Sequence, residues 1–63
     1  MSFVLIFRFK DGPFSGEVVS VGPFMNVGLV NVFIIDRNLN EKGTVVNILP
    51  LRDMNSFLAD LEL

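Results

Sequence analysis

The chain has 63 residues with no cysteine and no histidine, so it forms one domain at most and contains no disulfide. Zinc would find only carboxylate ligands, which makes a structural zinc site unfavourable. The net charge is −2 and the five basic residues are scattered, whereas binding to a phosphate backbone depends on clustered Lys and Arg.

Hydrophobic content restricts the architecture further. Hydrophobic residues make up 51% of the chain, yet a chain this short buries only about 60% of the surface that its unfolded form exposes. Small folds compensate with disulfides, metals or association, and only association is open to this chain. We therefore expect a homodimer or higher oligomer, in which a second copy or a larger protein covers apolar surface that one chain cannot bury.

The first third of the chain predicts two strands. Residues 3–10 alternate with the period of a strand and place four apolar side chains on one face, namely Phe3, Leu5, Phe7 and Phe9. Residues 14–21 predict the second strand. The tripeptide Gly-Pro-Phe occurs at 12–14 and again at 22–24. This spacing equals one strand plus one turn, which favours two turns over a repeated ligand motif.

The middle of the chain predicts two further strands. Residues 27–36, VGLVNVFIID, are apolar on both faces at a period of two, which predicts a central strand buried on both sides. The polar residues 37–43 predict a hairpin loop. Residues 44–49 predict the fourth strand, which we expect to end at Pro50.

The C-terminal segment changes to a helical period. Its apolar residues recur at helical spacing, namely Leu51, Met54, Leu58 and Leu61, and predict a helix over residues 53–62 with Asp53 as N-cap. The expected fold is mainly β within the α+β class. It is a four-stranded antiparallel meander, flat or curled into a small barrel, with a short C-terminal helix covering part of one face.

The stretch between Glu17 and Asp36 has eighteen uncharged residues, the lower length limit for a transmembrane helix. Pro23, the many β-branched residues and the acidic flanks instead favour two strands around a turn. The apolar N-terminus also lacks the preceding positive residues of a signal peptide. We therefore expect a cytoplasmic protein.

No group of residues predicts catalysis or a cofactor. Nucleophilic catalysis requires an activated Ser, Cys or Thr beside a base, and no carboxylate has an apolar sequence context that would raise its pKa. Asp36, Asn38 and Asn40 match the opening of a calcium loop, but Glu41 and Asn47 stand where that loop requires Gly and Glu. We expect a protein that is not an enzyme and holds no cofactor or metal.

These observations predict an oligomeric protein–protein interaction module that acts as an adaptor or inhibitor of a larger protein. The uncharged stretch around the second Gly-Pro-Phe predicts its partner-binding residues, namely Phe24, Met25, Val27 and Leu29. The alternative is a nucleic-acid-binding small β-barrel, with Arg8 between Phe7 and Phe9, and the acidic net charge favours the first function. A weaker third hypothesis places the Phe24-Met25 tip on a membrane surface.

Overall fold

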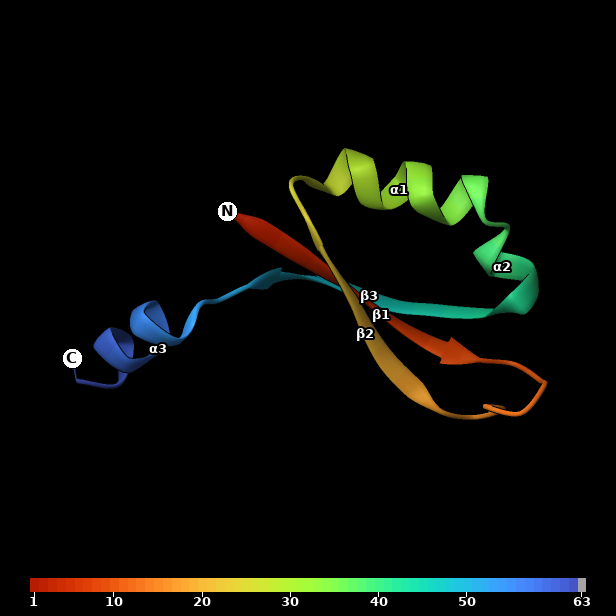
Figure 1. The fold of residues 1–63 in the computed structure, drawn as a ribbon, viewed down its shortest axis with the longest axis horizontal. Helices are drawn as coiled ribbons and strands as arrows, with labels where there is room; N and C mark the ends of the chain where they lie inside the picture. Colours follow the sequence, from red (N-terminus) through yellow and green to blue (C-terminus); the bar gives the residue numbers. More distant parts are fainter. Residues whose placement is uncertain (63) are drawn as a thin grey trace.

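The computed structural model describes residues 1–62 and contains a three-stranded antiparallel sheet and three helices (Figure 1). The elements in chain order are β1 Ser2–Phe9, β2 Val18–Phe24, α1 Val27–Asp36, α2 Leu39–Lys42, β3 Gly43–Leu51 and α3 Met54–Leu61. The mixed α+β class is compatible with this architecture. The expected four-stranded meander or barrel is wrong, because one predicted strand is a helix and the sheet has three strands.

The sheet order β2-β1-β3 puts the first strand of the chain in the centre. β1 pairs antiparallel with both neighbours, so that Leu5 lies opposite Val21 on one side and Ile48 on the other. Because both outer strands oppose β1, β2 and β3 run parallel to each other. Their connection must therefore cross the sheet, and this crossing carries α1 over one of its faces.

The two Gly-Pro-Phe stretches have different structures. The first lies in the β1–β2 turn, as expected, where Gly12 has a φ of 83°. The second lies inside β2, and Phe24 pairs with Phe3 of β1. The expected second turn thus begins only at Met25. An edge strand accepts Pro23, since the missing N–H of a proline costs no ladder hydrogen bond when it faces away from the sheet.

Residues 27–36 form α1 rather than the expected central strand. The side chain of Asn26 accepts a hydrogen bond from the Leu29 amide at 2.9 Å and caps the helix. Val30 and Ile34, one turn apart, are the buried residues of α1. An apolar run of this length fits a strand and a helix equally well by periodicity, and the Asn26 cap is the local signal that favours the helix.

The core lies between α1 and the sheet face that carries the odd-numbered residues of β1. Its buried residues are Leu5, Phe7, Val30 and Ile34, each 9% exposed or less. Partly buried neighbours surround them, including Phe3, Phe9, Val19, Val21, Phe24, Phe33, Leu39, Val45 and Ile48. The alternation along β1 therefore identified its core face correctly from the sequence.

The connection from α1 to β3 is helical rather than a simple hairpin loop. Asn38 adopts the left-handed conformation at φ 52° and is the N-cap of α2, and Gly43 is its C-cap. A Cβ on Gly43 would overlap the Arg8 carbonyl oxygen and lie 2.6 Å from Phe7 Cζ, so this position requires glycine. β3 then continues through Pro50 to Leu51. The expectation that Pro50 ends the strand is wrong, because β3 is also an edge strand.

The C-terminal helix forms where the sequence predicts it, but not in the expected place. α3 extends from the end of β3 and lies beyond the sheet, far from α1 and α2 (Figure 1). None of its residues is buried. The expectation that it covers part of a sheet face is therefore wrong: α1 covers one face, and no element among residues 1–62 covers the other.

Candidate functional site

Among residues 1–62, fifteen large hydrophobic side chains are exposed, whereas only four are buried. Apart from single residues, they gather on three surfaces. We name these the outer surface of α1, the open face of the sheet and the α3 stripe. Each is made by regular secondary structure, so its residues are held in a fixed order.

The outer surface of α1 lies opposite the side that packs on the sheet. Helical geometry places Gly28, Val32 and Ile35 there, with Leu29 on the flank. Val32 and Ile35 are 54% and 73% exposed. No charged residue occurs between Met25 and Ile35, so α1 exposes apolar side chains on the solvent side up to its last residue, Asp36. A helix of this kind is normally covered on both sides.

The four predicted partner-binding residues do not form one site. Met25, Val27 and Leu29 are exposed at the start of α1. Phe24 instead points toward the core, where its ring centroid lies 5.4 Å from that of Phe33. Sequence reasoning missed Val32 and Ile35, because a strand buried on both faces would have hidden them. Their i, i+4, i+7 spacing from Gly28 was the available signal.

The open face of the sheet is the one opposite α1. Strand alternation and register give it five apolar residues, namely Val4, Ile6, Val18, Leu49 and Leu51. Leu49 and Leu51 lie at the end of the sheet from which α3 leaves. At the opposite end exposed Arg8 lies between Thr44 of β3 and Val18 of β2, so the face there combines a positive charge with one apolar residue.

The α3 stripe consists of Met54, Phe57, Leu58 and Leu61, all more than half exposed. The helix is held at its start by Asp53, whose carboxylate accepts a hydrogen bond from the Ser56 amide at 2.7 Å. This hydrogen bond lowers the pKa of Asp53 below its ordinary value. Across the helix, Arg52 forms an ion pair with Asp60. The helix therefore rests on local polar contacts rather than on packing.

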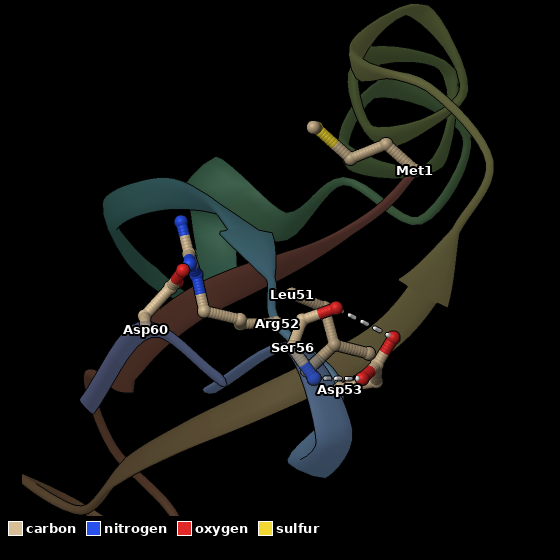
Figure 2. A pocket seen from close by; sticks show the side chains of 6 residues that line it. All are labelled: Met1, Leu51, Arg52, Asp53, Ser56 and Asp60. Atoms are coloured by element: carbon tan, nitrogen blue, oxygen red, sulfur yellow. Dashed lines mark hydrogen bonds and ion pairs between the residues drawn. The ribbon is translucent and has the colours of Figure 1, made fainter. Parts of the chain in front are cut away.

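A hollow of about 400 Å³ lies where α3 meets the sheet (Figure 2). It is lined by Met1, Leu51, Arg52, Asp53, Ser56 and Asp60. Its charged groups already bind one another: Asp53 holds Ser56, and Arg52 faces Asp60. The hollow thus lies at the connection between the sheet and α3, and its polar groups serve to cap α3 rather than to bind a ligand.

The part of the chain that the structure describes contains no cluster of three or more His, Cys, Asp or Glu residues placed to hold a metal. Among residues 1–62, no helix is long and apolar enough to span a bilayer. No protein-family model, curated protein or solved structure matches the chain. Its function is therefore inferred from the three surfaces.

Proposed function

We propose that this protein is a non-enzymatic interaction module of the cytoplasm, which acts as an adaptor or inhibitor by docking onto a larger protein. One observation carries the proposal: α1 exposes apolar side chains on the side that the sheet does not cover. Contiguous exposed apolar surface on a small protein is typical of a binding site.

The outer surface of α1 is the docking surface in this proposal. Gly28, Val32 and Ile35 occur at i, i+4 and i+7, the spacing with which a helix is bound in an apolar groove. Met25 and Leu29 extend the surface toward the start of the helix. Gly28 allows a partner to approach the backbone of α1 closely, because glycine has no side chain. The predicted residues Met25, Val27 and Leu29 remain in the proposal, and Phe24 contributes by positioning α1.

The nucleic-acid alternative loses the two features that favoured it. It relied on a small β-barrel, and the sheet is open with three strands. It also relied on Phe7 and Phe9 as base-stacking residues beside Arg8. Phe7 is 4% exposed in the core, and Phe9 packs edge-to-face against it at a centroid distance of 5.3 Å. Both rings lie on the face opposite Arg8.

Affinity capture from the source cell with three matched baits tests the docking proposal. We expect the wild-type chain and Asn31→Asp to retain the same larger protein by mass spectrometry, and Val32→Asp to lose it. Both substitutions introduce one carboxylate on α1, but only Val32 lies in the centre of the outer surface. With the purified partner, calorimetry should show binding at least about tenfold weaker for Val32→Asp. Equal capture by all three baits, or capture of no larger protein, would contradict the proposal.

A further inference from the structure

The open face and the α3 stripe leave this chain with more surface than its size requires. The accessible surface is 4967 Å² for a 7.0 kDa chain, whereas monomeric proteins of that mass expose about 4,000 Å². The radius of gyration is 13.8 Å, against about 10.6 Å for a compact chain of this length. The excess of roughly 900 Å² matches one side of a stable interface, which buries about 800 Å² per partner.

The two surfaces also match in length. α3 has eight residues, so it is about 12 Å long. On the open face, the distance along β1 from Val4 to Arg8 is about 13 Å. One helix can therefore lie along the open face from Val4 to Arg8 without extending past Arg8.

The order of chemical groups along the two surfaces is complementary. The open face runs from apolar Val4 and its neighbour Leu49 to the positive Arg8. The α3 stripe begins at Met54, and the helix ends among acidic side chains, Asp60 and Glu62. A helix laid from Val4 toward Arg8 thus places apolar residues on apolar residues and its acidic end beside Arg8.

We propose that two copies of this chain form a dimer by exchanging α3, each laying its α3 stripe on the open face of the other. A two-fold axis near the Ser2–Leu51 end of the sheet sets the two β3 strands antiparallel. The α3 of one copy then continues in the direction from Val4 to Arg8 of its partner. Such an interface is isologous, so one contact repeated twice covers both surfaces of both chains. The exchange leaves the outer surface of α1 free, and it does not depend on the docking function.

The chemistry of α3 favours a protein surface over a lipid surface as its partner. Interfacial membrane helices carry Lys and Arg on their polar side, because bilayers are anionic. The segment 52–62 has one basic residue, Arg52, which is paired with Asp60, and it also carries Asp53 and Glu62. The positive partner that this helix requires is present on the open face of a second copy.

Sedimentation equilibrium of the full chain at micromolar concentration tests the exchange. We expect a dimer for the wild type, and a dissociation constant raised at least about tenfold by Leu58→Asp, which places a charge in the α3 stripe. Ala59→Asp introduces the same charge on the opposite side of the same helix and should leave the dimer unchanged. Far-ultraviolet circular dichroism should show an intact sheet in all three. A monomeric wild type, or equal weakening by both substitutions, would overturn the proposal.

A charge exchange tests the orientation of the helix. Arg8→Glu and Glu62→Arg should each weaken the dimer about threefold to fivefold, as expected for an exposed ion pair, and the double variant should restore it. A dimer built from two α3 helices alone would be insensitive to Arg8, so the absence of rescue would overturn the exchange. Val32→Asp should leave the dimer intact and Leu58→Asp should leave partner capture intact, which separates failure of this proposal from failure of the docking function.

Discussion

α1 and α3 are both short helices that begin at an Asn or Asp cap and carry apolar side chains, yet only α1 enters the core. α1 buries Val30 and Ile34 against the sheet, whereas α3 buries none of its residues. Of the two, α3 has the clearer amphipathic pattern in the sequence. The helix with the clearer amphipathic pattern is therefore not the helix that packs more deeply.

Chain topology explains the difference. α1 belongs to the crossover between two parallel strands, and a crossover must pass over the sheet. α3 follows an edge strand at the end of the sheet and meets no such constraint. An isolated helix of eight residues is marginal in water, so within one chain α3 depends on its cap and on the Arg52–Asp60 ion pair.

The largest loss of stability should come from adding one methyl group on the side of the sheet that faces α1. We expect Gly43→Ala to cost about 3 kcal/mol or more, because its Cβ would overlap the Arg8 carbonyl oxygen and crowd the Phe7 ring. A domain this small has about 3–5 kcal/mol available, so folding should be lost. Gly16→Ala has open space around its Cβ and tests backbone strain alone, at φ 81°. Circular dichroism and urea unfolding compare the two; a folded Gly43→Ala chain would contradict the packing described.

The next largest effect separates the two sides of α1. Val30→Ala removes two methyl groups from a fully buried site and should lower the free energy of unfolding by about 2 kcal/mol. Val32→Ala makes the same change on the outer surface and should alter it by less than about 0.5 kcal/mol. Equal losses in urea unfolding would mean that the outer surface of α1 is covered within one chain.

Removing the cap of each helix sharpens the comparison. In the Leu58→Asp background, which should weaken the proposed dimer, Asn26→Ala should lower the free energy of unfolding by about 1 kcal/mol while α1 persists, because packing holds it. Asp53→Ala should instead reduce the helical signal and leave the urea midpoint unchanged, because α3 melts by itself. The two measurements are the far-ultraviolet circular dichroism and the urea midpoint of each variant. A shifted midpoint in Asp53→Ala would show that α3 is coupled to the core.

The smallest effect is a pH dependence confined to α3. The hydrogen bond from the Ser56 amide holds the pKa of Asp53 below its ordinary value of 3.8. A depressed pKa means that the ionised carboxylate stabilises the helix above pH 3.8 and that this contribution is lost as the pH falls through the folded value. Helical content should therefore fall in that acid range. Asp53→Asn caps without titrating, so the difference between the two titration curves isolates this group.

Part of the candidate site could be predicted from the sequence, because some exposed residues lie in a stretch whose local composition is unusual. The exposed residues Met25, Val27 and Leu29 lie in an uncharged stretch that the composition marks as unusual. Phe24 could not be separated from them, since whether its ring turns to Phe33 or to solvent depends on where α1 lies. The exposure of Val32 and Ile35 could not be predicted for a related reason. A strand and a helix expose different residues of the same apolar run, and the sequence did not decide between them.

The sequence by itself determined the elements whose signals are local: β1 from its alternation, the first turn from Gly12, and α3 from Asp53 and its helical spacing. Only the tertiary structure decided that residues 27–36 form a helix and that α3 lies beyond the sheet. An apolar residue gains the same free energy from burial in a strand or a helix, so its position is chosen by the surfaces that the rest of the fold offers. In this chain the crossover brings such a surface to α1, whereas the sheet offers none to α3 within one chain.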